Sequence, residues 1–239
     1  MDNCSPKEAA ARGALETFKD LISRSLVAGV GTGTTVKEFI SVASELLRGK
    51  RVLSSSLSTS LELSSRGVDV VSYPAERRTV DLYIDGADEV TADGHMIKGR
   101  GGALLGEKIL AYFSRVNIFI VGEDKLVGRL GSKGPLPIEV VPEAYPLVSE
   151  ELSSLGFKAV AREGSGKVGP LISDLRGMIV DVHTGPIERP EDLEATLKRI
   201  PGVVETGLFL GMADYIVVGK EDCNYEVLRF TRKTKAHFM

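Results

Sequence analysis

Cysteine is scarce in this chain, with only Cys4 and Cys223 among its 239 residues. The two have no CxxC spacing, and they fit free thiols in a reducing compartment. A chain of this length buries roughly 70% of its unfolded surface when it folds. We therefore expect a stable core that needs neither a disulfide nor a structural metal.

An excess of basic residues and long apolar runs are also missing. The net charge is −3 and the isoelectric point is about 5.8, whereas a protein that binds phosphate backbones needs a basic face. No stretch approaches the ~20 apolar residues of a membrane helix, and the N-terminal segment has no apolar core of a secretory signal. We expect a soluble, cytoplasmic protein that binds neither nucleic acid nor membranes.

The first 130 residues alternate short β-branched runs with helical patterns. A Ser-Pro start signal at Ser5 opens the first helix, and residues 34–49 carry apolar side chains at helical spacing. This alternation predicts an α/β fold with parallel strands, whose ligands bind at the carboxyl ends of the strands. The expected strands are residues 25–30, 51–56, 68–73, 80–85 and 116–122, and the expected helices are residues 5–18, 34–49, 58–67 and 103–114.

The pattern changes after residue 131. Strands at 137–141, 157–163, 178–183 and 203–209, with helices at 145–156 and 189–202, follow the order β-α-β-β-α-β, which is typical of a ferredoxin-like domain. The apolar run 213–219 predicts a strand that returns to the first sheet, and residues 231–239 have the composition of a loose tail. The predicted domains are therefore residues 1–131 with 208–239, and residues 132–207.

Two glycine-rich segments join predicted strands to predicted helices. In "GVGTGTT" (29–35), free backbone amides, the positive end of a helix dipole and the hydroxyls of Thr32, Thr34 and Thr35 would form an anion cradle. This segment lacks the Gly-Lys-Ser/Thr of a Walker loop and the third glycine of the dinucleotide fingerprint. A plain tight turn is the alternative.

The second segment, "IKGRGGALLGEKI" (97–109), repeats the device with Lys98 before the turn and Glu107 early in the helix. A solvated lysine and an exposed helix charge are the alternatives for these two residues. Between the two segments, "YIDGADEV" (83–90) carries Asp85, Asp88 and Glu89. A turn-forming aspartate followed by two charges near a helix N-terminus is the alternative there.

These three segments would gather along one edge of an α/β sheet. They would then combine anion-binding amides, carboxylates that exchange protons, and an ammonium group beside a developing oxyanion. Such a site suits proton transfer on a small phosphorylated polyol. The main alternative is a metal site, since carboxylates alone can hold Mg²⁺. The only histidines, His95, His183 and His237, show no ligand spacing, and His95 either lines the site or belongs to a loop.

Five segments, in this order and spacing, resemble the ribose-5-phosphate isomerases of type A: "GVGTGTT", "SSSLSTS", "YIDGADEV", "MIKGRGGALLGEKI" and "PLPIEVVP". The resemblance extends from Lys7 to residue 219. It implies interconversion of ribose 5-phosphate and ribulose 5-phosphate, in the pentose phosphate pathway, without a metal or an organic cofactor. It also implies a Rossmann-like main domain, a smaller α+β domain and a homodimer or homotetramer.

The resemblance also implies roles for individual residues. Glu107 corresponds to the family's proton-transferring base. From the chemistry of the residues themselves, Asp85, with Asp88 nearby, would assist ring opening, and Lys98 with Thr32 or nearby amides would stabilise an enediolate. The implied substrate-binding residues are Lys7, Thr32, Gly33, Thr34, Thr35, Asp85, Gly86, Ala87, Asp88, Lys98, Gly99, Arg100, Gly101 and Lys125.

Two positions depart from the family pattern. Arg100 replaces a usual glycine, and Gly106 stands where an arginine or another polar residue is common. Neither departure removes a reacting group. Two other functions stay open at this point. One is a domain that senses a sugar phosphate without turning it over, and the other is a sugar-phosphate deaminase or CoA transferase on a related fold.

Overall fold

The computed structural model describes residues 4–72, 79–164, 166 and 168–233. The chain divides into two compact units. The first comprises Met1–Ala87, Gly106–Leu126 and Gly211–Met239, and the second comprises Asp88–Leu105 and Val127–Leu210. The predicted boundaries differ from this division chiefly at residues 88–105, which the sequence assigned to the main domain and which group here with the second unit.

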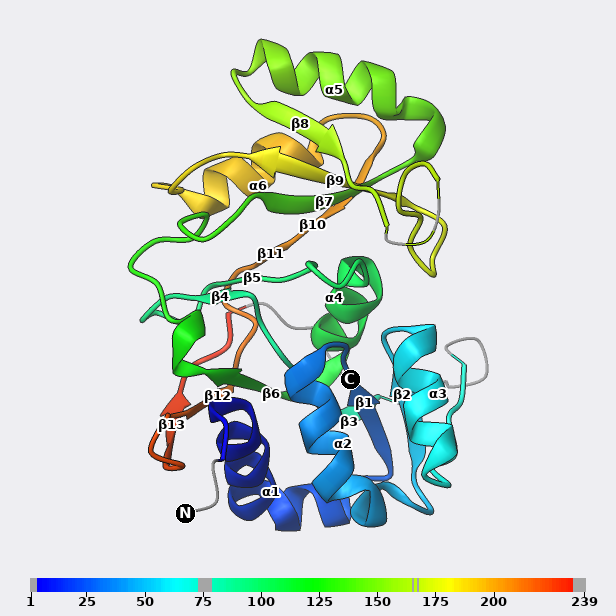
Figure 1. The fold of residues 1–239 in the computed structure, drawn as a ribbon, viewed down its shortest axis with the longest axis vertical. Coiled ribbons are helices and arrows are strands. Elements are labelled where there is room, and N and C mark those ends of the chain that lie inside the picture. The colour runs from blue at the N-terminus through cyan, green and yellow to red at the C-terminus, as the bar shows by residue number, and fades with distance from the viewer. Residues whose placement is uncertain (1–3, 73–78, 165, 167, 234–239) are drawn as a thin grey trace. The chain divides into compact units, whose positions relative to one another are not determined.

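A six-stranded sheet forms the centre of the first unit (Figure 1), in the order β13-β12-β6-β3-β1-β2. All strands are parallel except the edge strand β13, which pairs antiparallel with β12. The return of the segment 213–219 to the first sheet is therefore confirmed. The strands are β1 (Val27–Val30), β2 (Arg51–Ser54), β3 (Val80–Asp85), β6 (Ser114–Gly122), β12 (Tyr215–Gly219) and β13 (Tyr225–Arg229).

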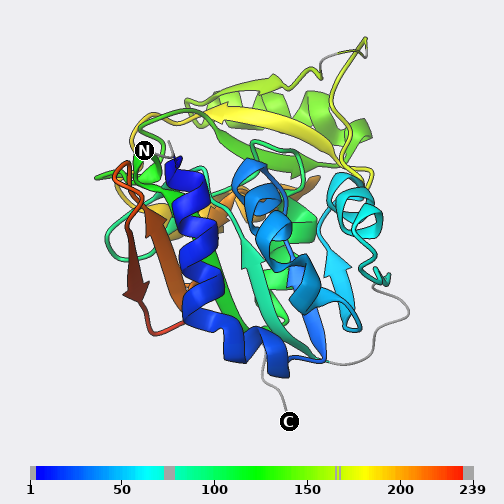
Figure 2. The same ribbon diagram turned by 60° about the horizontal axis from the view of Figure 1, so that its bottom comes forward.

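The helices of this unit begin where the sequence signals predict. Ser5 caps α1 in a reciprocal capping box with Glu8, and Gly33 precedes α2. The helices are α1 (Pro6–Arg24), α2 (Thr34–Leu47), α3 (Leu57–Ser65) and α4 (Leu104–Tyr112), the last of which starts in the second unit. Figure 2 shows α1 and α2 side by side over one face of the sheet. Ala14 of α1 and Phe39 of α2 join Ile84 of β3 in one buried cluster.

The other face of the sheet receives the alternate side chains of β3. Ile84 belongs to the cluster under α1 and α2, so its neighbours Tyr83 and Asp85 point to the opposite face. Leu110 of α4 lies on that face too, because a Cβ built on Gly29 would be 2.9 Å from Tyr83 Cδ2 and 3.4 Å from Leu110 Cδ2. Helix α4 and the Asp85 side chain therefore share one face.

The second unit contains the predicted β-α-β-β-α-β order. Its four strands form an antiparallel sheet in the order β10-β7-β9-β8, which confirms the ferredoxin-like pattern. The elements are β7 (Leu136–Val140), α5 (Tyr145–Ser154), β8 (Lys158–Ala161), β9 (Met178–His183), α6 (Pro190–Lys198) and β10 (Val203–Thr206). Val148 of α5 and Leu197 of α6 pack with Ile138, Val180 and Val182 on one face of this sheet.

A small sheet that the sequence did not predict completes the second unit. Strands β4 (Glu89–Val90), β5 (Met96–Ile97) and β11 (Leu208–Phe209) pair in the order β11-β5-β4. The expected strand 203–209 is therefore wrong as one element, since it divides at Gly207 into β10 and β11. The N–H of Gly207 donates to the Pro137 carbonyl (2.7 Å), and the Gly207 carbonyl accepts from Lys98 N–H (2.9 Å). Gly207 thus belongs to the borders of two sheets at once.

Three further expectations need correction. The segment 68–73 makes only one parallel bridge, Val52 to Val70, instead of a strand, and residue 73 lies outside the described residues. Its β-branched residues favour extended backbone, but one position alone reaches β2. Strand β13 was not predicted. Within the expected loose tail, Arg232 is buried and donates to the Ser114 carbonyl (2.6 Å), while residues 234–239 lie outside the described part.

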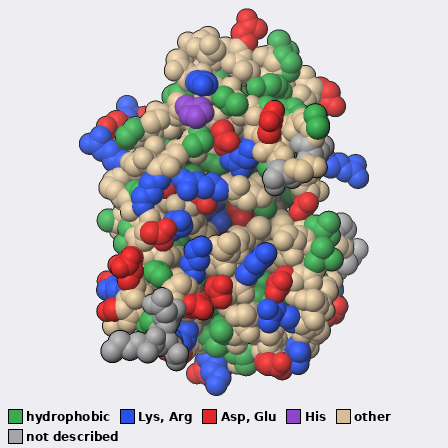
Figure 3. Space-filling view, viewed as in Figure 1, with side chains coloured by type: hydrophobic (Ala, Val, Ile, Leu, Met, Phe, Trp, Pro, Cys, Tyr) green, Lys and Arg blue, Asp and Glu red, His purple; other side chains and the backbone are tan. Residues whose placement is uncertain are grey.

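The surface and the helices agree with the composition. Side chains of both charge signs are interspersed over the face seen in Figure 3. None of the helices in the described residues is long and apolar enough to cross a membrane.

Candidate functional site

Asp85 is held in place by three hydrogen bonds. It ends β3 and is fully buried. Its Oδ1 accepts hydrogen bonds from the N–H of Gly86 (2.7 Å) and of Thr32 (3.1 Å), and its Oδ2 accepts one from the Tyr83 hydroxyl. Gly31 makes this arrangement possible, because a Cβ there would be 1.9 Å from Asp85 Cγ. The loop after β1 and the end of β3 are thereby locked together.

The Thr32 hydroxyl belongs to a cluster of hydroxyl groups. Its Oγ1 lies 2.7 Å from Ser55 Oγ, 2.7 Å from Ser56 Oγ and 3.2 Å from Thr59 Oγ1. Ser56 also caps α3 by accepting from the N–H of Thr59. The segment "SSSLSTS" thus supplies hydrogen-bonding groups at the end of β2, a role that the sequence reading did not assign to it.

The N-terminus of α2 has the features of an anion site. Gly33 is its N-cap and offers no side-chain cap, and the first turn contains no acidic residue. The N–H groups of Thr34 and Thr35 therefore lie at the positive end of an uncompensated helix dipole. The anion cradle expected from "GVGTGTT" stays a prediction, and these amides are the groups that would form it.

Glu107 lies in the first turn of α4 and is 3% exposed. The alternative of a solvent-exposed helix charge is therefore wrong. Its neighbour Gly106 packs against the end of β2, because a Cβ there would be 2.7 Å from the Ser55 carbonyl oxygen. The glycine that departs from the family pattern lets α4 approach the hydroxyl cluster, and α4 covers the sheet face to which Asp85 points.

Lys7 and Lys125 lie at the same edge of this sheet, farther from β1. Lys125 ends a 3₁₀ turn, Glu123–Lys125, directly after β6, and its Nζ lies 2.8 Å from Asp124 Oδ2. Lys7 is in the first turn of α1, where Pro6 packs closely against Gly219 at the end of β12. Both ammonium groups thus belong to segments at the carboxyl ends of parallel strands.

The second unit contains Asp88, Lys98 and the glycine loop 99–101. Lys98 is 3% exposed, and its Nζ lies 5.5 Å from the centre of the Phe209 ring, so the alternative of a solvated lysine is wrong. Asp88 Oδ2 accepts from the N–H of Arg100 (2.9 Å). The Arg100 side chain is 41% exposed, and its Nη2 lies 3.7 Å from Oε1 of the buried Glu89.

Glu89, the third carboxylate of "YIDGADEV", has a structural role. It is fully buried in β4, and its two oxygens accept from the N–H groups of Gly131 (2.7 Å), Ser132 (3.2 Å) and Lys133 (3.0 Å). The alternative that Asp88 and Glu89 are helix N-terminal charges is wrong, since a strand follows instead. Glu89 anchors a loop within its unit.

His95 lies beside two acidic side chains of the second unit. His95 Nε2 lies 3.3 Å from Asp93 Oδ2 and 3.4 Å from Glu191 Oε1, which favours its reading as a loop residue. In the part of the chain that the structure describes, no group of three or more His, Cys, Asp or Glu side chains could hold a metal ion.

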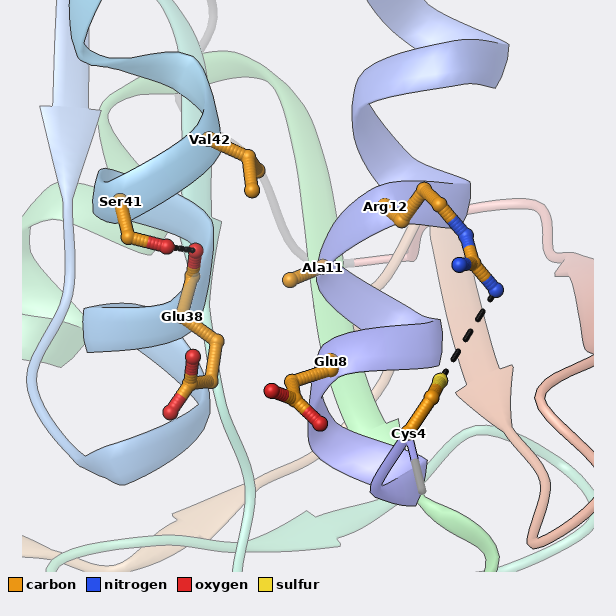
Figure 4. A pocket seen from close by; sticks show the side chains of 7 residues that line it. All are labelled: Cys4, Glu8, Ala11, Arg12, Glu38, Ser41 and Val42. Atoms are coloured by element: carbon orange, nitrogen blue, oxygen red, sulfur yellow. Dashed lines mark hydrogen bonds between the residues drawn. The ribbon is translucent and has the colours of Figure 1, made fainter. Parts of the chain in front are cut away.

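A hollow of about 300 Å³ between α1 and α2 is a separate feature (Figure 4). It contains none of the candidate residues; its lining is Cys4, Glu8, Ala11, Arg12, Glu38, Ser41 and Val42. Cys4 is a free thiol, as expected, and so is Cys223, whose Sγ lies 3.5 Å from the Cys4 carbonyl oxygen.

The candidate residues thus form two groups, one in each unit. Thr32–Thr35, Asp85–Ala87, Glu107, Lys125 and Lys7 belong to the first unit, and Asp88 with Lys98–Gly101 to the second. The chain passes from the first unit to the second at Ala87–Asp88 and returns at Leu105–Gly106. Carboxylates, a buried ammonium group and an anion cradle are the groups that an acid–base reaction on a phosphorylated sugar requires.

Comparison with known proteins accords with this chemistry. The family model of ribose 5-phosphate isomerase A (phosphoriboisomerase A) matches residues 51–223. A ribose-5-phosphate isomerase A of Aeropyrum pernix is 50% identical over 232 residues, which cover 95% of this chain and 97% of the relative. Another from Gloeobacter violaceus is 44% identical, over 92% and 95% of the two chains.

Solved structures agree. The ribose 5-phosphate isomerase A of Methanocaldococcus jannaschii has a TM-score of 0.85 at 34% identity, over 93% of this chain and 97% of that one. A D-ribose-5-phosphate isomerase in complex with phospho-erythronic acid has a TM-score of 0.85 at 36% identity, over the same shares. On this identity and coverage, the chain belongs to the ribose-5-phosphate isomerase A family and is a ribose-5-phosphate isomerase.

Proposed function

We propose that Glu107 transfers the proton between C2 and C1 during the interconversion of D-ribose 5-phosphate and D-ribulose 5-phosphate. The observation that carries the proposal is the burial of Glu107 in the first turn of α4, on the sheet face to which Asp85 points. A carboxylate can accept a carbon-bound proton and return it without forming a covalent adduct. General acid–base catalysis of this kind contributes roughly 10²–10⁴-fold in rate.

Asp85 and Asp88 are proposed to open the sugar ring. This step exchanges protons with the ring oxygen and the anomeric hydroxyl, so it needs a carboxylate of fixed orientation. Three hydrogen bonds fix Asp85, and one bond from Arg100 N–H orients Asp88. Asp85 is better fixed, while Asp88 is better exposed to an entering sugar.

Lys98 is proposed to stabilise the enediolate that forms after the first proton transfer. The negative charge of this intermediate lies on oxygen, and a positioned ammonium group in a site of low water content stabilises it strongly. The burial of Lys98 supports this role. Thr32, whose hydroxyl belongs to the cluster at the ends of β1 and β2, is the proposed second donor.

The phosphate is proposed to bind at the N-terminus of α2, with Lys125 and Lys7 as cationic partners. Amides at a helix N-terminus together with ammonium groups form a strong phosphate site. The phospho-erythronic acid bound by the similar solved protein fits this division of charge, because such an acid has a phosphate at one end and a carboxylate at the other. The carboxylate resembles the charged oxygens of the enediolate.

The remaining expectations stay part of the proposal. Gly33, Gly86, Ala87, Gly99 and Gly101 would contribute backbone groups to substrate binding, and Arg100 would add charge. We propose catalysis without a metal or an organic cofactor, a homodimer or homotetramer, and a cytoplasmic location.

Glu107→Gln tests the central step. The variant keeps the shape of the side chain but cannot accept a proton, so kcat should fall at least ~10²-fold with near-normal KM. It should also fail to incorporate deuterium from D₂O at C1 or C2, which NMR follows. Glu45→Gln, at an exposed position of α2, is the matched control. Wild-type exchange in the Glu107 variant would assign the base to another residue.

A further inference from the structure

Arg162 holds the backbone of the glycine loop that follows Lys98. It comes directly after β8, more than 60 positions after this loop in the sequence. The sequence alone did not single it out. One nitrogen, Nη1, donates to the Gly99 carbonyl (2.8 Å) and to the Arg100 carbonyl (2.8 Å). These are the carbonyls of the two residues that follow Lys98, and all of these residues belong to the second unit.

Asp181 of β9 holds Arg162 in turn. Nε donates to Asp181 Oδ2 (2.8 Å) and Nη2 to Asp181 Oδ1, a bidentate pair in which the side chains are 16% and 19% exposed. Val180 and Val182, on either side of Asp181, pack in the core with α5 and α6. Asp181 therefore points to the opposite face of the sheet, where Pro137 contacts the loop: its Cβ lies 3.3 Å from a Cβ built on Gly99.

The loop is linked to two candidate residues, to Lys98 through the chain and to Asp88 through a hydrogen bond. On the N-terminal side, Lys98 N–H donates to the Gly207 carbonyl (2.9 Å), while on the C-terminal side Arg162 fixes the next two carbonyls. The N–H of Arg100 donates to Asp88, so the peptide units that Arg162 holds also contact the second proposed ring-opening carboxylate. Displacing this loop would move Lys98 and Asp88 together.

Only arginine can make this set of contacts. Nε and Nη2 form the fork that binds both oxygens of Asp181, which leaves Nη1 for the two carbonyls. Lysine has a single nitrogen with three donors, which cannot serve a bidentate carboxylate and two carbonyls on different sides. The ion pair is largely shielded from water, so removing either partner leaves the other charge poorly compensated.

We propose that Arg162, oriented by Asp181, is a positioning residue that sets the place of the Lys98 ammonium group for catalysis. This inference rests on the role proposed for Lys98 in stabilising the enediolate. It also gives the ferredoxin-like sheet a function in the reaction, because the surface opposite its helices carries the pair that holds a proposed substrate-binding loop.

A double-mutant cycle between Arg162 and Lys98 tests the proposal. Arg162→Met should lower kcat by roughly 10- to 10²-fold, as misplacements of about 1 Å do, with a smaller change in KM. In a Lys98→Met background the same change should cost clearly less, because residues that act through one group are not additive, and the loss that remains is the part that acts through Asp88. Arg162→Lys and Asp181→Asn, which keep more of the contacts, should give intermediate losses. Arg129→Met, which removes an exposed pair with Glu188, should leave kcat unchanged.

The possible outcomes distinguish the role of Lys98 in the reaction from the positioning role of Arg162. A wild-type kcat in Lys98→Met overturns the role of Lys98 itself. An equal loss from Arg162→Met in both backgrounds overturns the positioning role and leaves that of Lys98 intact. Thermal unfolding and circular dichroism check that each variant is folded; should Arg162→Met fail to fold, the cycle is run with Arg162→Lys, for which equal losses in both backgrounds overturn the proposal in the same way.

Discussion

The backbone N–H of Thr32 donates a 3.1 Å hydrogen bond to Oδ1 of Asp85, although 53 positions separate the two residues. The strand order explains the contact. From β1 the chain proceeds outward to β2 and then returns to β3 on the other side of β1. The loops after β1 and β3 therefore diverge at a topological switch point, where open α/β sheets bind their ligands.

The first prediction concerns the glycine that permits this contact. Gly31→Ala places a Cβ 1.9 Å from the present position of Asp85 Cγ, so the carboxylate has to move by more than 1 Å. We expect kcat for ribose 5-phosphate to fall by about 10²-fold or more, while circular dichroism remains that of a folded protein. Gly128→Ala is the control, because a Cβ there meets no atom within 4 Å. A folded Gly31→Ala enzyme with wild-type kcat would exclude Asp85 from the reaction.

The second prediction concerns the phosphate. Lys125→Ala should raise KM for ribose 5-phosphate about tenfold or more, since a hydrogen bond to a charged group is worth about 1.5–3 kcal/mol. The kcat/KM for unphosphorylated D-ribose, assayed at high sugar concentration, should stay unchanged, because the lost partner is the phosphate. Lys158→Ala removes an exposed lysine of the second unit and serves as the control. If KM rises equally for both substrates, Lys125 supports the structure and does not bind phosphate.

The fold was predictable wherever local pattern and tertiary structure agree. The residues of β9 have the predicted bounds, 178–183, because a buried strand between two turns needs no distant information. The division at Gly207 was not predictable, since it depends on the carbonyl of Pro137 and the N–H of Lys98, which lie about 70 and 109 positions away. The sequence of β13 alternates only weakly between apolar and polar residues, and the strand forms by pairing with β12.

The candidate site, like the fold, contains residues whose place could be predicted from the sequence and residues whose place could not. The places of Thr32 and Asp85 in the fold could be predicted from the sequence, because each lies where a predicted strand meets a glycine-containing turn. Glu89 and Arg162 could not be assigned. Their partners are backbone groups of the loops 131–133 and 99–100, and any residue type can supply such groups, so no sequence pattern marks them.

The third prediction is that activity does not depend on a metal. The reaction as proposed needs only proton transfer by carboxylates and one ammonium group, so no Lewis acid has to polarise the carbonyl. After dialysis against EDTA and assay in metal-free buffer, kcat and KM should equal those of the untreated enzyme. Addition of Mg²⁺ or Mn²⁺ should change neither. A loss of activity that either ion restores would contradict the prediction.

The last prediction concerns Glu139 of β7, whose carboxyl lies on the same sheet face as Asp181. It is almost fully buried, and its Oε1 accepts from the Ser173 hydroxyl (2.6 Å). Burial, the largest cause, raises its pKa above the ordinary value of 4.5, although the Ser173 hydroxyl and nearby backbone N–H groups act in the opposite direction.

The sign of the pH effect follows from linkage. Because the folded pKa lies above the unfolded one, the folded state binds more protons between the two values, and stability falls as pH rises through that window. In Glu139→Gln this contribution disappears. Its free energy of unfolding, measured in urea between pH 4.5 and 8, should therefore increase with pH relative to that of the wild type. Glu143→Gln, at an exposed position, should run parallel to the wild type. If the Glu139 variant also runs parallel, the carboxyl has the same pKa in the folded and the unfolded protein, and the raised pKa is wrong.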